Sequence, residues 1–187
     1  MPFQSVKTSV RLAAAVALVA MLAFVIAGDA EAATIQIVAL GASNTVGYGV
    51  GASNSWAGRL TAMLKAKGYD VNVTNMGVVG DTSAGILARV NAIPAGTRVV
   101  VFDSGAGNDQ DAGNSGTAAG RIAAAIRARG AKPVFAAYRH IVGPEKTNPS
   151  AWVAGDAHHH LTAESHARVA AALLPQVIVG IGNAKSR

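Results

Sequence analysis

Cysteine is absent from the 187-residue chain, which excludes disulfide bonds, thiol nucleophiles and cysteine metal ligands. Aromatic residues make up 5% of the sequence. The formal net charge is +6, but the basic residues are scattered and are not interleaved with aromatics. This composition argues against a nucleic-acid partner. After residue 32, no stretch is long and apolar enough to span a membrane.

The first 32 residues have the layout of a secretory signal peptide. Lys7 and Arg11 form a positive region, and an apolar run follows from Leu12 to Gly28. Small residues around Glu31 offer a cleavage site after Ala32 or Ala33. We therefore predict an exported protein, periplasmic or secreted, without stable membrane insertion once the leader is removed. The alternative is an uncleaved anchor, since the run of about 17 residues is at the short limit for a bilayer span.

Residues 33–187 alternate strand and helix patterns and predict a single domain. Apolar and β-branched runs indicate strands at 34–40, 71–74, 99–102 and 133–138. Periodic apolar residues indicate helices at 55–67, 86–90, 117–129 and 162–174, with Pro175 ending or kinking the last one. Glycine-rich or aperiodic segments at 77–85, 104–115 and 141–156 are expected to be loops. This order predicts an α/β fold with a parallel sheet and helices on both faces.

Some individual residues can be given structural roles from the same patterns. Asn54 is a plausible cap for the first helix, and Trp56 falls on the core face of that helix. Asp81 or Thr82 is expected to cap the next helix. Of the two tryptophans, Trp152, in the expected loop at 141–156, is therefore the better candidate for substrate contact.

Ser43 is the first candidate for chemistry, because it follows the apolar run that ends at Leu40 on a Gly41-Ala42-Ser43-Asn44 turn. In open α/β sheets, ligands bind at the carboxyl ends of the strands. A serine hydroxyl is a weak nucleophile and needs an adjacent base. Taken alone, a serine at this place is more often a turn or helix cap.

Two later turns could supply hydrogen-bond donors. Gly80, in Gly-Asp-Thr, could present a backbone N–H to an oxyanion, although a simple strand-to-helix turn also explains it. Asn108, in Gly-Asn-Asp, could donate from its side-chain amide, a contribution of about 3–4 kcal/mol in a favourable site. The alternative for Asn108 is an ordinary Asn-Asp turn.

A cluster of acid and imidazole groups lies just before the last helix, as Asp156 followed by His158, His159 and His160. Histidine suits a general base near pH 7, and an aspartate can hold its ring in the useful tautomer. A metal site is disfavoured, because three adjacent residues cannot easily point at one ion. His140 and His166 are expected to be structural.

Together these residues resemble the SGNH (GDSL-type) hydrolases from Ile35 to about Val177. The resemblance implies a flavodoxin-like three-layer α/β/α sandwich and no cofactor or metal. It implies Ser43 as nucleophile and an oxyanion hole made by the N–H groups of Ser43 and Gly80 and the Asn108 amide. The Asp/His cluster corresponds to the family's catalytic Asp and His. We expect a monomer that acts on a small-molecule, glycan or lipid ester.

Three positions depart from the family pattern. Ala42 replaces the usual aspartate of Gly-Asp-Ser, which leaves the mechanism intact but changes local hydrogen bonding. Ala106 replaces the first glycine of Gly-x-Asn-Asp. The family spacing Asp-x-x-His selects Asp156 with His159, whereas the His-Leu-Thr sequence that enters the helix selects His160. We favour His160, and His159 stays open.

The implied function is a serine esterase that hydrolyses short acyl or aryl esters through an acyl-enzyme. The alternatives are a carbohydrate O-acetylesterase, a lysophospholipase or thioesterase, and a non-catalytic extracellular binding module of the same fold.

Overall fold

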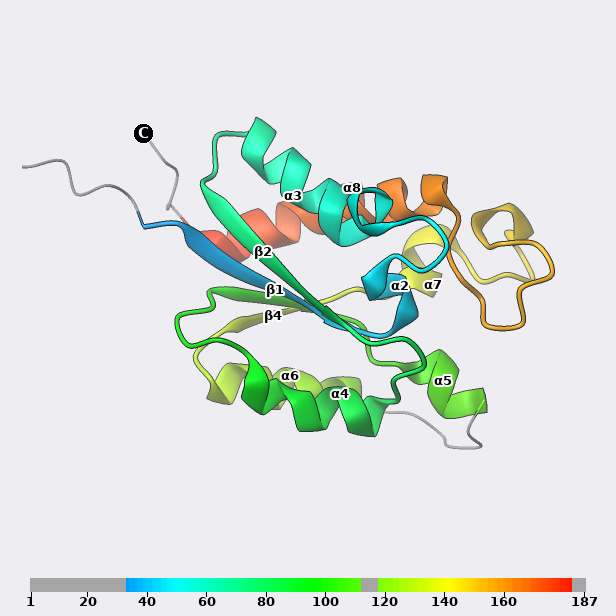
Figure 1. Ribbon diagram of the computed structural model, residues 1–187, viewed down its shortest axis with the longest axis horizontal. Helices are drawn as coiled ribbons and strands as arrows, with labels where there is room; N and C mark the ends of the chain where they lie inside the picture. Colours follow the sequence, from blue (N-terminus) through cyan, green and yellow to red (C-terminus); the bar gives the residue numbers. More distant parts are fainter. Residues whose placement is uncertain (1–32, 112–117, 183–187) are drawn as a thin grey trace, which may run out of the picture. The chain divides into compact units, whose positions relative to one another are not determined.

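Four parallel strands form one sheet in the order β2-β1-β3-β4 in the computed structural model, which describes residues 33–111 and 118–182. The strands are β1 (Ile35–Gly41), β2 (Val71–Gly77), β3 (Val99–Phe102) and β4 (Lys132–Phe135). Figure 1 shows helices on both faces of this sheet. The predicted α/β class and parallel sheet are confirmed. The predicted signal peptide lies outside the described residues.

The three layers arise because both faces of the sheet are apolar. Along β1, Ile37 and Ala39 belong to the core on one face, and Val38 and Leu40 to the core on the other. Alternate residues of a strand point to opposite faces, so a strand buried on both faces is a continuous apolar run. The first core is covered by α3 (Trp56–Ala66) and α8 (Ala163–Ile181), the second by α4 (Ser83–Arg89) and α6 (Ala119–Ala128).

The strand order places a switch point between β1 and β3. The chain moves from β1 to β2 on one side and from β3 to β4 on the other. Flavodoxin-like sheets bind ligands in the crevice at this point. Two short helices begin at that edge, α2 (Ser43–Val46) after β1 and α5 (Ala106–Asp111) after β3. The candidate residues Ser43 and Asn108 therefore follow the two strands that flank the switch point.

Several predicted boundaries shift. Strand β2 is longer than predicted, because its pairing with β1 continues to Gly77. Strand β4 is shorter, since α7 (Tyr138–Val142) begins where the strand was expected to end. The expected loop at 104–115 contains α5, and the one at 141–156 contains the end of α7 and a 3-10 turn at Pro149–Ala151. These short helices bury too few residues to show a helical period in the sequence.

The last helix does not end at Pro175, as one form of the prediction had it, because α8 continues to Ile181. A proline removes one helical hydrogen bond, which costs about 3 kcal/mol or more. Pro175 lies on the exposed side of α8, whereas Val177 and Ile181 beyond it are fully buried. Burial of this continued apolar face offsets the lost bond.

Most of the predicted helix caps and buried side chains are found in the structure. Ser55, not Asn54, caps α3, because its Oγ accepts from the Gly58 N–H. Thr82 caps α4 as expected. Trp56 and His166 are fully buried, which confirms a core role for Trp56 and a structural one for His166.

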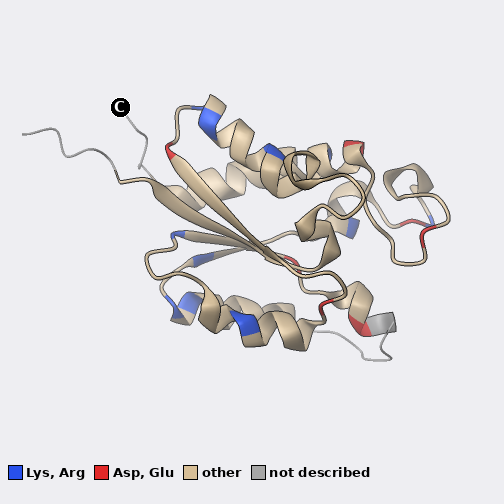
Figure 2. Ribbon diagram, viewed as in Figure 1, with Lys and Arg blue, Asp and Glu red and all other residues tan. Residues whose placement is uncertain are grey.

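Basic residues are spread over helices on both faces of the sheet within the described part of the chain (Figure 2). They do not gather along one element. None of the helices in residues 33–111 and 118–182 is long and apolar enough to cross a bilayer.

Candidate active site

A cavity of about 260 Å³ lies at the carboxyl edge of the sheet. Ser43 and Asn108 both line it, as do His158 and His159. Its other walls come from the segments after β1, β3 and β4: Ala42, Asn44, Asp103 to Gly107, Phe135 to His140, and Trp152. The structure thus gathers side chains from four distant parts of the sequence around one space.

Ser43 is the first residue of α2 and is buried. The N–H groups of a helix's first turn have no partner within the helix, so that of Ser43 is available as a donor. The chain leaves this short helix through Gly47, which adopts a left-handed conformation with φ 84°. The local fold therefore presents both the hydroxyl and the N–H of Ser43 at the end of β1.

His160 and Asp156 form a closely bonded pair. The Nδ1 of His160 lies 2.5 Å from Oδ2 of Asp156, and the His160 N–H donates to the same oxygen over 2.9 Å. The N–H of His158 donates to Oδ1 over 3.0 Å. Burial raises the pKa of Asp156, but these hydrogen bonds and the charge of His160 outweigh it and lower the pKa below its ordinary value. Asp156 is therefore a carboxylate that holds His160 through ring and backbone together.

The ring of Tyr48 stacks on the ring of His160, with centroids 4.6 Å apart and planes at 28°. His160 is 6% exposed, whereas Tyr48 is 52% exposed. Tyr48 therefore covers the imidazole and limits its rotation. His160 does not line the cavity itself.

Asn44 connects the serine turn to the histidine segment. Its Oδ1 accepts from the Leu161 N–H over 2.9 Å, and its Nδ2 donates to the His159 carbonyl over 3.4 Å. These two bonds lie on either side of His160. Among the described residues no hydrogen bond joins Ser43 to His159 or His160. Such bonds are often long in unliganded enzymes and tighten with substrate.

His159 has a carboxylate of its own. Its Nδ1 lies 2.5 Å from Oε2 of Glu145, outside hydrogen-bond geometry. Its φ of 54° is left-handed, which is uncommon for a residue with a side chain. The ring stands edge-on to Trp152, with centroids 6.4 Å apart. His159 thus faces the cavity and Glu145, whereas His160 faces Asp156.

Asn108 and its neighbour Asp109 are both bonded to the loop that carries Gly80. The Asn108 amide donates to the Asp81 carbonyl over 2.7 Å, and Asp109 Oδ1 accepts from the Ser83 N–H over 2.9 Å. Gly80 is exposed, has φ 75° and is not part of the cavity lining. The structure therefore places Asn108 in the cavity with Ser43, and Gly80 on the loop beside them.

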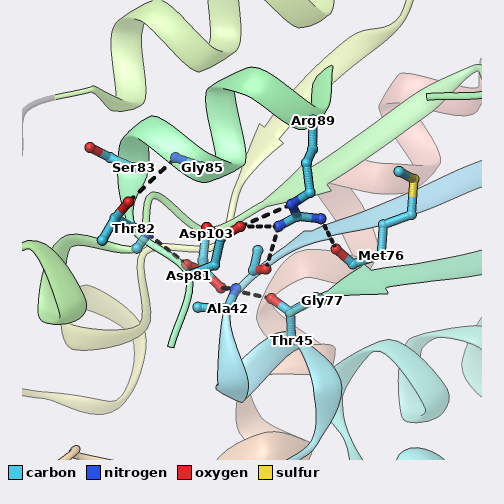
Figure 3. Close-up of polar contacts among 12 residues, drawn as sticks. Ala42, Thr45, Met76, Gly77, Asp81, Thr82, Ser83, Gly85, Arg89 and Asp103 are labelled. Carbon is cyan, nitrogen blue, oxygen red and sulfur yellow. Dashed lines mark hydrogen bonds and ion pairs between the residues drawn. The ribbon is translucent and has the colours of Figure 1, made fainter. Parts of the chain in front are cut away.

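Arg89 holds this loop against the strand ends (Figure 3). Its guanidinium donates to the Gly41 carbonyl over 3.0 Å and to the Met76 carbonyl over 2.5 Å. Its Nε donates to Asp81 Oδ2 over 2.9 Å. One side chain of α4 thus joins the carboxyl ends of β1 and β2 to the loop that follows Gly80.

Sequence reasoning missed Asn44, Tyr48, Asp103 and Glu145. Asn44 belongs to the turn Gly41-Ala42-Ser43-Asn44, but its hydrogen-bond partners Leu161 and His159 are more than a hundred residues away in the chain. Trp152, expected to contact substrate, lines the cavity but is 5% exposed and donates from Nε1 to the Gly143 carbonyl. In the described ranges no group of three His, Asp or Glu side chains is placed to hold a metal ion.

The sequence model of the GDSL-like Lipase/Acylhydrolase family matches residues 39–179. Among curated proteins, the chain is similar to Esterase TesA of Pseudomonas aeruginosa, with 38% identity over 81 residues. That match covers 42% of this chain and 40% of the esterase. The matched part of the chain therefore covers less than half the length of this esterase.

Solved structures of similar fold include the crystal structure of TesA and that of the psychrotrophic esterase EstA from Pseudoalteromonas sp.. The first has a TM-score of 0.60 at 24% identity and covers 78% of this chain and 99% of that one. The second, inhibited by monoethylphosphonate, has a TM-score of 0.53 at 15% identity and covers 76% and 96%. At these identities, the two structures support the three-layer fold alone.

Proposed function

Since the chain belongs to the GDSL-like lipase/acylhydrolase family, we propose that it hydrolyses carboxylic esters through an acyl-enzyme formed on Ser43. His160 is the general base, and Asp156 orients it. The observation that carries this proposal is the Asp156–His160 pair, whose neighbouring backbone is bonded on both sides to Asn44. Asn44 is the residue next to Ser43, so it brings base and nucleophile segments together.

The proposed reaction depends on proton transfer to and from the ring of His160. Because Nδ1 is bonded to Asp156, Nε2 is the nitrogen that accepts the hydroxyl proton of Ser43 as its oxygen attacks the ester carbonyl. The proton then passes to the leaving alcohol, and an acyl-serine remains. A water gives a proton to His160 and attacks the acyl carbon; the bond from the acyl carbon to the Ser43 oxygen then breaks, His160 returns the proton to that oxygen, and the carboxylic acid leaves. No cofactor takes part in this scheme.

The negative charge of each tetrahedral intermediate falls on the former carbonyl oxygen. We assign its stabilisation to the N–H groups of Ser43 and Gly80 and the amide of Asn108. The amide of Asn108 is held in direction by the Asp81 carbonyl, so its second N–H is free to donate. Gly80 has no side chain to block its N–H, and apart from its own atoms and its two chain neighbours no atom lies within 4 Å of the place a Cβ would take.

The cavity favours a small apolar ester. Its volume of about 260 Å³ is below the usual range of ligand sites, roughly 300–1,000 Å³. Most of the exposed large apolar side chains lie at or after strand ends or near the histidine segment, namely Tyr48, Val78, Val79, Phe135 and Val153, whereas Val179 lies on α8. We propose short acyl or aryl esters as substrates. Acetyl groups on glycans, lysophospholipids and thioesters are the alternatives.

A fluorophosphonate probe tests the mechanism. It forms a bond to an activated serine oxygen with loss of fluoride, and peptide mass mapping locates the adduct. We expect labelling at Ser43, which the Ser43→Ala variant abolishes together with at least a thousandfold loss of kcat on a short aryl ester. Ser104→Ala, which alters another cavity serine, is the matched control and should be labelled normally. An active, folded Ser43→Ala variant would refute the nucleophile.

One observation favours a second candidate function. The Ser43 hydroxyl makes no hydrogen bond to a histidine among the described residues, as a non-catalytic binding module would also show. Folded wild-type protein that resists the probe, yet binds an acylated glycan or ester in calorimetry, would favour that module over the esterase.

The cellular location is a separate proposal. The pattern in residues 1–32 supports export to the periplasm or outside the cell, followed by removal of the leader. The released domain is proposed to act as a monomer. N-terminal sequencing of the protein expressed in its host would test the cleavage after Ala32 or Ala33.

A further inference from the structure

A buried carboxylate that is absent from the proposed catalytic triad lies beneath the serine turn. Asp103 follows β3, in the middle of the sheet, and is 6% exposed. Its Oδ2 accepts from the Ala42 N–H over 3.0 Å and from the Thr45 hydroxyl over 2.7 Å. Ala42 and Thr45 stand on either side of Ser43 and Asn44, so one oxygen fixes both ends of the turn.

The other oxygen of Asp103 reaches the asparagine loop. Its Oδ1 accepts from the Gly105 N–H over 2.8 Å. Gly105 directly precedes α5, which carries Asn108, and it has a left-handed φ of 66°. The two oxygens of one side chain therefore join the segment that presents the Ser43 N–H to the segment that presents the Asn108 amide.

A second layer holds Asp103 in place. The Tyr138 hydroxyl donates to Oδ2 over 3.1 Å, and it accepts from the indole N–H of Trp56 over 2.9 Å. Burial and then the charge of Asp103 raise the pKa of Tyr138 well above its ordinary value, so this hydroxyl keeps its proton and remains a donor. Each group in the chain from Trp56 to Asp103 has a defined direction of donation.

The sequence explains why this carboxylate comes from β3. The turn Gly41-Ala42-Ser43-Asn44 contains no acidic residue, so the carboxylate beneath it is supplied by the residue that follows β3. Only glycine at position 41 leaves room for Asp103, because a Cβ there would lie 2.1 Å from its Oδ2. The carboxylate thus occupies space at the turn that a side chain on Gly41 would fill.

We propose that Asp103 is a positioning residue that sets the Ser43 N–H and the Asn108 amide at the spacing a tetrahedral oxyanion needs. This inference rests on the proposed ester hydrolysis. A shift of about 1 Å in a catalytic group can cost a hundredfold in rate. Asp103 lines the cavity, but both of its oxygens are bonded to the two donor segments. In this assignment it has no contact with the reacting atoms and acts through those segments.

The test compares Asp103→Asn with the wild-type enzyme. The amide keeps the size of the carboxylate but replaces one acceptor oxygen by an NH₂ donor. This NH₂ group faces either the Gly105 N–H or the Ala42 N–H, so one of the two donor segments loses its hydrogen bond. We expect kcat to fall about a hundredfold with KM changed less than threefold. The affinity for an aryl boronic acid, which becomes a tetrahedral anion on Ser43, should fall by the same factor as kcat/KM.

Two controls separate positioning from stability. Ile122→Ala removes a buried side chain of α6, in the core on the other face of the sheet, and should lower the melting temperature while leaving kcat and boronate affinity at wild-type values. If Asp103→Asn fails to fold, the Thr45→Val/Tyr138→Phe double variant replaces it. That variant removes two donors to Oδ2 and should lose about tenfold in both kcat and boronate affinity.

The outcomes are distinct for the two proposals. Wild-type rates and boronate affinity in Asp103→Asn, or in the double variant where that is used, would overturn the positioning role and leave the esterase intact. A loss of stability in either variant without a loss of boronate affinity would also overturn it. Wild-type protein that neither hydrolyses esters nor reacts with the fluorophosphonate would overturn the proposed function, and the positioning role with it.

Discussion

The side chain of Asn44 accepts a hydrogen bond from the backbone N–H of Leu161 over 2.9 Å. The two residues are 117 positions apart in the chain, yet each is next to a proposed catalytic residue. Asn44 follows Ser43, and Leu161 follows His160. The bond fixes the distance between the end of β1 and the entrance to α8, which no local interaction could set.

Replacing Asn44 by alanine should therefore weaken catalysis more than folding. The variant loses the bonds to Leu161 and His159, so the histidine segment can move away from Ser43. We expect kcat to fall about ten- to a hundredfold, with a loss of about 1 kcal/mol in unfolding free energy. Steady-state kinetics and urea unfolding measure the two effects. Asn72→Ala, which removes an exposed amide from β2, is the control and should leave kcat unchanged, and equal kcat values in the two variants would contradict the role.

The identity of the base can be decided by separate variants of the two histidines. His160→Ala should lower kcat by at least a thousandfold, because the ring bonded to Asp156 is lost. His159→Ala should retain kcat within about tenfold, since its ring faces Glu145 and Trp152. A reversed result would make His159 the base and Glu145 its partner. Circular dichroism of both variants checks that each one folds.

The main features of the fold could be predicted because they depend on local patterns. The buried strand at Val99–Phe102 was predicted with its observed bounds, since an apolar run between turns has a strong signal. The end of α8 could not be, because the rule against proline ignores which face of the helix it occupies. Pro175 lies on the exposed side, and the buried residues beyond it extend the helix.

The candidate site shows the same division. Ser43, Asn108, Asp156 and His160 could be selected from residue type and from resemblance. The roles of Asp103 and Asn44 depend on partners that the fold brings together, and that of Tyr48 depends on ring stacking on His160, which lies near the other end of the chain. Residues of this kind have no spacing in the sequence that marks them, because their partners are fixed by tertiary structure alone.

Arg89 should stabilise the site and the fold together. In Arg89→Met the Met76 carbonyl and the Asp81 carboxylate lose the donor that α4 supplies, whereas the Gly41 carbonyl keeps its bond from the Val78 N–H. Partly buried acceptors without partners cost about 2 kcal/mol in unfolding free energy, which urea unfolding measures. We also expect kcat to fall about tenfold, since the loop carrying Gly80 is released. Arg129→Met, which removes a single bond to the Ile93 carbonyl at the other end of the domain, should leave kcat unaltered, and a stable, fully active Arg89→Met variant would contradict the prediction.

His166 predicts how stability depends on pH. Burial, followed by the charges of Arg59 and His160, lowers its pKa from 6.5 to about 4. Its Nδ1 accepts from the Trp56 N–H, so the folded protein holds this ring neutral. Between pH 6.5 and 4 the unfolded chain binds a proton at His166 that the folded chain does not, so the free energy of unfolding falls as the pH falls. One pKa unit corresponds to about 1.4 kcal/mol, which gives a loss of about 3 kcal/mol across this range from His166 alone.

The variant His166→Asn isolates this contribution, because its Oδ1 can accept the same Trp56 N–H but cannot bind a proton. Unfolding free energies from urea titrations at pH 4, 5, 6 and 7 measure the difference. The pKa of Asp156 is also lowered in the folded state, so its contribution to the free energy of unfolding is lost as the pH falls. This loss is the same in the wild type and the variant and therefore cancels in the comparison. The wild type should lose about 3 kcal/mol more than the variant between pH 6.5 and 4, and parallel curves would show that the buried ring takes up its proton in the folded state as readily as in the unfolded one.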